Sequence, residues 1–141
     1  MNYARLALAA VAATVFDALY GFVVYGMLLA PEFAKYPAVY RSNEAGQAFL
    51  PLMFGGLLIA IAAAAVIYAK GYEGGNGLAE GARFGFLLGI FVVFAFAAVN
   101  YATLEIGRRL AAMVAAAAFA EWLAIGTIIG LVYKPAAGSR R

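Results

Sequence analysis

Four long runs of apolar residues, separated by short polar or glycine- and proline-containing segments, divide the chain. The runs cover residues 4–30, 48–69, 82–103 and 110–133. A helix that crosses a bilayer needs about 20 mainly apolar residues, and each run is long enough. Stretches such as residues 59–66 lack the alternation of apolar and polar residues that a membrane-spanning strand shows. The pattern predicts four membrane-spanning helices.

The connections are short, so we expect a single transmembrane domain, an all-α four-helix bundle in up-down-up-down order. The longest connection, residues 31–47, contains Pro31 and Pro37 and has room for a short helix at the membrane surface. It is either a plain connector or a lid that binds a partner. The connection at residues 70–81 is rich in glycine but matches neither phosphate-binding glycine motif, so we expect a flexible turn.

The composition agrees with a membrane protein, because 67% of the 141 residues are hydrophobic and 12% are charged. Soluble domains are about half apolar and about a quarter charged. The chain contains no cysteine and no histidine. This excludes disulfides and thiol catalysis and removes the usual ligands of haem and zinc. We therefore expect no metal site and no catalytic residue, and we identify no cofactor, although a lipid or another lipophile remains a candidate ligand.

The basic residues indicate the orientation in the membrane. With a cytoplasmic N-terminus, six of the ten lysines and arginines lie inside and four lie outside, which favours both termini in the cytoplasm. The first apolar run is longer than the core of a cleaved secretory signal, so we expect it to be retained. Tyr25 is among the tyrosines assigned to the outer aromatic belt, and Tyr20 lies deeper.

Glycines at intervals of four residues recur in the apolar runs. Such G-x-x-x-G steps let two helix backbones approach closely in lipid. The third run begins with one such series, the fourth carries another, and two adjacent glycines give the second run a small face. Gly81, Gly85 and Gly89 lie at the start of the third run, Gly126 and Gly130 lie in the fourth, and Gly55 and Gly56 lie in the second. They predict close helix packing.

Two acidic residues interrupt the apolar runs. Asp17 lies in the middle of the first run and Glu121 in the middle of the fourth, so antiparallel helices place both at the same depth. An ionised acid at that depth costs about 2.5–3.5 kcal/mol or more to insert. Small residues at helical spacing predict that both acids face other helices. We expect at least one to be protonated at neutral pH and to donate a hydrogen bond. The candidate partners are the other acid, Thr14, Tyr20, Asn100 and Thr127.

Three interpretations of the acid pair stay open. The acids are polar contacts that join helices, a site that couples to protons or cations, or a recognition site for a ligand or partner. A second charged group, Glu105, Arg108 and Arg109, lies between the third and fourth runs on the outer side. Its members are solvated anchors, or they contact an anionic lipid headgroup or a partner carboxylate.

The connection between the second and third runs carries a distinctive pattern. The letters KGYEG at residues 70–74 precede GLAEGARFG at residues 77–85. Together with Asp17, Glu121 and LVYKP at residues 131–135, the chain resembles a group of small bacterial four-span membrane proteins of uncharacterised function. The resemblance implies a compact four-helix integral membrane fold and carries over no activity.

We therefore expect a non-enzymatic protein of the bacterial cytoplasmic membrane that acts through protein–protein contacts, as an accessory or assembly subunit or as a homo-oligomer. Two alternatives remain. One is a small proton- or cation-coupled transporter or channel that uses Asp17 and Glu121. The other is a binder of a quinone, carotenoid or lipid between helices. Partners are membrane lipids and other membrane subunits or further copies of the chain. Nucleic acid is not expected, because no basic cluster is interleaved with aromatic residues.

Overall fold

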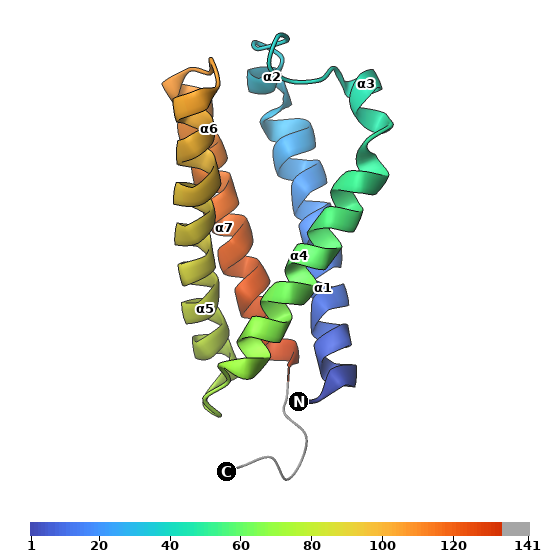
Figure 1. The fold of residues 1–141 in the computed structure, drawn as a ribbon, viewed down its shortest axis with the longest axis vertical. Coiled ribbons are helices and arrows are strands. Elements are labelled where there is room, and N and C mark those ends of the chain that lie inside the picture. The colour runs from blue at the N-terminus through green and yellow to red at the C-terminus, as the bar shows by residue number, and fades with distance from the viewer. Residues whose placement is uncertain (134–141) are drawn as a thin grey trace.

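The computed structural model describes residues 1–133, and every regular element within them is helical (Figure 1). The prediction of a four-helix membrane protein is confirmed, because four helical stretches are long and apolar enough to cross a membrane. They are Tyr3–Leu28, Leu50–Lys70, Gly77–Thr103 and Arg108–Val132. The C-terminal part of the LVYKP pattern lies outside the described residues.

Two of the four stretches contain a wide π-turn. The first consists of α1 (Tyr3–Val23) and η1 (Val24–Leu28), and the third consists of α5 (Gly77–Val92), η2 (Val93–Ala97) and α6 (Ala98–Thr103). The second and fourth are the uninterrupted helices α4 (Leu50–Lys70) and α7 (Arg108–Val132). The long connection, where one short helix was expected, holds two: α2 (Ala30–Phe33) and α3 (Asn43–Gln47).

The two ends of the bundle have different connections (Figure 1). At the terminal end, α1 begins, α7 ends and residues 71–76 join α4 to α5. The Asn2 and Asn76 side chains cap α1 and α5 there by accepting hydrogen bonds from backbone N–H groups. Gly74 has a φ of +87°, a conformation that suits glycine and lets the chain reverse. At the distal end lie α2, α3 and the connection at residues 104–107.

The apolar core lies toward the terminal end. Its side chains come from the first part of α1, the second half of α4 and the last part of α7. They are Ala9, Ala10, Ala13, Ile61, Ala64, Ala65, Tyr68, Ile125, Ile129 and Tyr133. No side chain of residues 50–60 is buried. Figure 1 shows α4 crossing α1 and then diverging from it toward α3, so α4 packs in the bundle through its second half alone.

The contact between α5 and α7 is made of glycine. A Cβ atom on Gly81 would lie 2.7 Å from the carbonyl oxygen of Gly126, and one on Gly85 would lie 2.5 Å from that of Leu123. A Cβ on Gly130 would overlap the backbone of Gly77. The two backbones therefore touch over several turns, which is the geometry that small residues permit in lipid. Gly89, one turn further along α5, rests against Phe119 of α7.

The glycines of α4 do not pack as expected. Among the described residues, and apart from the adjacent residues and backbone of α4 itself, no atom lies within 4 Å of a Cβ built on Gly55 or Gly56. Both belong to the half of α4 that diverges from the bundle, so the expectation that they support packing within the chain is wrong. Within residues 1–133, these two glycines of α4 therefore have no packing partner.

The glycine contact gives a direct test. Gly126→Ala should lower the free energy of unfolding by roughly 1–3 kcal/mol, because the new methyl group would overlap the backbone of Gly85. Gly55→Ala, the matched control, should leave stability unchanged or slightly raised, because alanine is the better helix former. Titration of the protein in mixed micelles with a denaturing detergent, followed by circular dichroism, measures both. Equal losses in the two variants would contradict the packing described here.

Candidate functional site

Asp17 of α1 and Glu121 of α7 are buried within the membrane-spanning region. Their exposed fractions are 2% and 8%. Asp17 is the last buried residue of α1, and the buried neighbours of Glu121 along α7 include Ala117 and Ala118. The two acids therefore lie at the distal limit of the apolar core, on helix faces that point away from lipid.

The two carboxyl groups lie within hydrogen-bonding reach of each other. The Tyr25 hydroxyl donates to Oε2 of Glu121 at 3.1 Å. In the described part of the chain, no N–H or hydroxyl group donates to either oxygen of Asp17. An ionised carboxylate can only accept hydrogen bonds. The two groups can therefore satisfy each other only when one of them carries a proton.

Two tyrosines of the first span join it to α7 around the acid pair. The Tyr20 hydroxyl donates to the carbonyl oxygen of Ala117 at 2.8 Å, one turn before Glu121. The rings of Tyr20 and Tyr25 pack edge to face, with centroids 6.2 Å apart. Tyr25 belongs to the π-turn η1, and such turns are frequent at functional sites. The site thus consists of two acids and two phenols.

The sequence interpretation missed Tyr25, which it assigned to the outer aromatic belt. The available signal was spacing, because Tyr25 follows Asp17 by eight residues, slightly more than two helical turns. The expected partners Thr14 and Thr127 are wrong, because each hydroxyl donates at 2.8 Å to the carbonyl four residues earlier in its own helix. Tyr20 is also wrong as a hydrogen-bond partner of the acids, because its hydroxyl donates to the Ala117 carbonyl. Asn100 is also wrong as a partner, because it is exposed on α6.

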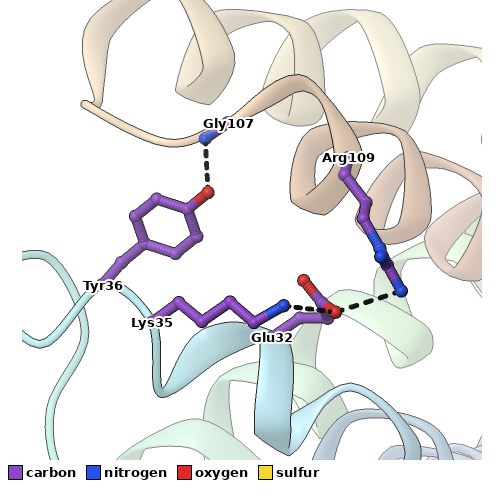
Figure 2. Close-up of polar contacts among 5 residues, drawn as sticks. All are labelled: Glu32, Lys35, Tyr36, Gly107 and Arg109. Atoms are coloured by element: carbon purple, nitrogen blue, oxygen red, sulfur yellow. Dashed lines mark hydrogen bonds and ion pairs between the residues drawn. The ribbon is translucent and has the colours of Figure 1, made fainter.

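A second polar cluster, which we call the distal clasp, consists of Glu32, Lys35, Tyr36, Gly107 and Arg109 (Figure 2). Oε1 of Glu32 accepts a hydrogen bond from Lys35 Nζ at 2.8 Å and pairs with the Arg109 guanidinium at 3.2 Å. The backbone N–H of Gly107 donates to the Tyr36 hydroxyl at 3.0 Å. These contacts fasten the segment around α2 to the start of α7.

The charges of the distal clasp stabilise the ionised form of Glu32. The hydrogen bond from Lys35, helped by the charge of Arg109, holds the pKa of Glu32 below its usual range, against the opposing effect of burial. Of the three outer charges singled out in the sequence, Arg109 is thus engaged by the chain itself. Within residues 1–133, Glu105 and Arg108 form no ion pair and are exposed. Sequence reasoning missed Glu32, although its spacing from Lys35 favours a pair on one helical turn.

A third polar cluster shapes the turn before α5. Oε1 of Glu80 accepts a hydrogen bond from the Gly75 N–H, and its Oε2 accepts one from the Tyr68 hydroxyl at 3.4 Å. Arg83 pairs at 2.8 Å with Glu73 on the surface. Glu80 therefore turns inward to bind the preceding loop and does not pair with Arg83, three residues later on α5.

The distal clasp predicts a difference between adjacent arginines. Arg109→Ala should increase amide hydrogen exchange in residues 30–36, because Glu32 loses one of its two cations. Arg108→Ala should not, because this side chain has no partner at the clasp. In the native protein, the lowered pKa of Glu32 keeps the clasp closed until the pH falls through that lowered value. Hydrogen exchange measured by mass spectrometry checks the comparison of the two variants, and equal exchange in both would refute it. The same measurement on the native protein across an acid titration checks the opening of the clasp at low pH.

The described residues hold no group of three or more histidine, cysteine or acidic side chains placed to bind a metal ion. A comparison of this chain with protein-family models, curated proteins and solved structures returns no match. Its function therefore has to be argued from the helices, the acid pair and the surfaces described above.

Proposed function

We propose that this chain is a non-catalytic integral membrane protein that acts by assembling with other membrane-embedded helices. Its partners are further copies of the chain, or it is an accessory subunit of a larger complex. One observation carries the proposal, namely that residues 50–60 of α4 leave the bundle. In that segment Leu52 and Ile59 are 74% and 72% exposed, and no side chain is buried.

The adjacent glycines Gly55 and Gly56 make this segment more than an ordinary lipid-facing surface. Glycine inside a helix costs roughly 0.5–1 kcal/mol relative to alanine. The glycines of α5 and α7 offset that cost through their backbone contact, whereas those of α4 contact no other element within residues 1–133. Small residues let a second helix approach closely and gain van der Waals contact in lipid. A partner helix on this face would give the two glycines a structural role.

The setting that we propose is the cytoplasmic membrane of a bacterium, with the terminal end of the bundle in the cytoplasm. The uneven division of lysine and arginine, six against four, supports this orientation. Membership in the group of small four-span bacterial proteins that the sequence resembles is part of the same proposal.

Assembly can be measured on the purified protein in lipid nanodiscs. If the chain associates with itself, native mass spectrometry should show dimers or larger species in the wild type. Gly56→Leu should weaken that association about tenfold or more, because tenfold corresponds to about 1.4 kcal/mol and the bulkier side chain prevents close approach. Ala116→Leu, on an exposed position of α7, is the control; it adds three carbon atoms where Gly56→Leu adds four.

The same preparation separates the two kinds of partner. A chain that is single in nanodiscs but co-purifies from native membranes with a foreign subunit in fixed ratio is an accessory subunit, provided that Gly56→Leu removes that subunit. A single chain with no such subunit would overturn the proposal.

A second candidate function is proton- or cation-coupled transport through the acid pair. The observation that favours it is the burial of both Asp17 oxygens without any donor in the described part of the chain. Acids inside membrane-spanning segments often mark ion pathways, because their insertion cost needs a functional return.

Transport can be tested in liposomes that contain a pH-sensitive dye. An imposed membrane potential should acidify or alkalinise the lumen faster with the wild-type protein than with Asp17→Asn or Glu121→Gln, by about tenfold or more. Glu105→Gln is the matched control, because this acid is exposed at the distal end. Equal fluxes in all four proteins would exclude coupling through the pair.

A further inference from the structure

We propose that Asp17 and Glu121 hold one proton between their carboxyl groups, and that this proton fastens the first span to α7 at the distal limit of the core. The proposal deepens the second candidate function, because it names the ligand of the acid pair. It does not require that the proton be carried across the membrane.

The count of hydrogen-bond donors leads to this assignment. The pair presents four carboxyl oxygens, and the Tyr25 hydroxyl donates to one of them, Oε2 of Glu121. The nearby Tyr20 hydroxyl is engaged with the carbonyl of Ala117. Both oxygens of Asp17 are left without a donor in the described chain. A proton on either acid supplies the missing donor, since a protonated carboxyl can donate to its neighbour.

No cation replaces that proton among the described residues. The first span contributes Tyr20 and Tyr25 to the site, and these are uncharged phenols. The ionisable groups of α4 are Tyr68 and Lys70, near its C-terminal end, where Tyr68 is bound to Glu80. Those of α5 belong to its first two turns, Glu80 and Arg83, and Arg83 pairs with Glu73 on the surface. Two ionised carboxylates would therefore repel each other without a neutralising charge.

The hydrogen bond from Tyr25 favours one proton over two. A phenol donates more strongly to an ionised oxygen than to a neutral one. The Tyr25 hydroxyl, which donates to Glu121, therefore favours the state that leaves one negative charge on the pair. A shared proton then gives that charge a second donor. Such a pair binds and releases its proton as a unit.

A metal cation fits the site less well than a proton. Hard cations such as Ca²⁺ and Mg²⁺ need about six or more oxygen ligands. Beyond the two carboxyls, the hydroxyl of Tyr25 donates into the pair and the carbonyl of Ala117 is already engaged. A proton requires one donor and one acceptor only, which the two carboxyls supply.

Loss of the proton should act on the distal half of the bundle. Two adjacent negative charges, one on α1 and one on α7, would push these helices apart at the acid pair. The terminal half is held by the core and by the glycine contact of α5 with α7. Separation of the first span from α7 is therefore expected on the distal side of Asp17, because no side chain of residues 18–28 is buried.

Infrared difference spectroscopy in nanodiscs tests for the proton itself. The wild type should show the carbonyl band of a protonated carboxyl at neutral pH, and the band should disappear in alkaline buffer. Tyr25→Phe should shift this band, because it removes a hydrogen bond while keeping both acids. The double variant Asp17→Asn with Glu121→Gln should lack the band, and Glu105→Gln should retain it unchanged.

Distances between spin labels test the coupling to helix spacing. The chain has no cysteine, so spin labels attach only at introduced cysteines. Labels at Met27→Cys and Ala112→Cys report the distance between the first span and α7 in the distal half. Labels at Leu8→Cys and Leu131→Cys report the same distance in the terminal half. These four positions are exposed. Alkaline buffer should lengthen the distal distance alone. Asp17→Asn should abolish this change, because the amide donates to Glu121 at every pH.

Each outcome decides the proposal. A wild-type spectrum without a protonated carboxyl at neutral pH, a band that survives in the double variant, or a spectrum that responds to sodium rather than to pH would overturn it. An unchanged distal distance would overturn the fastening role. If the infrared band behaves as expected but the protein carries no proton flux in liposomes, the shared proton is supported and transport is rejected. The shared-proton proposal and the transport proposal can therefore fail separately.

Discussion

The contact of glycine with backbone between α5 and α7 is the constraint on which the rest of the structure depends. No side chain separates the two helices at Gly81, Gly85 and Gly126, so neither helix can slide or rotate without a clash. This contact leaves a different face of α7 free to pack against α1 and the second half of α4, where Ile125 and Ile129 enter the core. Glu121 follows from the same arrangement, because the helix turn that buries Ile125 also turns Glu121 toward Asp17.

The two halves of the bundle are held together by different kinds of contact. The terminal half has the glycine contact, the apolar core and a turn bound by Glu80. The distal half has two π-turns and the diverging half of α4 (Figure 1). There the first span is held to α7 by the hydroxyls of Tyr20 and Tyr25 and by the distal clasp. Leu29 and Leu110 are buried in this half, but residues 18–28 of the first span have no buried side chain. Changes in proton content can therefore act there where they would not act on the core.

The sequence predicted the features that depend on period and composition. Four apolar runs of bilayer length fix four helices, and an acid at the middle of a span has to face protein because lipid cannot solvate it. It did not predict contacts that depend on how helices cross. Tyr25 was placed by depth alone, and nothing local shows that η1 turns its hydroxyl toward Glu121. The divergence of α4 is equally invisible, because Gly55 and Gly85 each follow a phenylalanine and lie two residues before a pair of leucines in sequence, yet have opposite surroundings in the fold.

Two features carry a cost that the fold of one chain does not offset. The glycines of α5 and α7 are required by the backbone contact, and Glu80 is required by its turn. Among the residues that the structure describes, the glycines in the diverging half of α4 have no packing neighbour, and the acid at the end of the core, Asp17, has no hydrogen-bond donor. Sequences that fold well violate local rules mainly where function demands it. Both violations fall at or beyond the distal limit of the core cluster. A partner helix would offset the first and a proton the second, so the same half of the bundle supports both proposals while the terminal half serves as their fixed base.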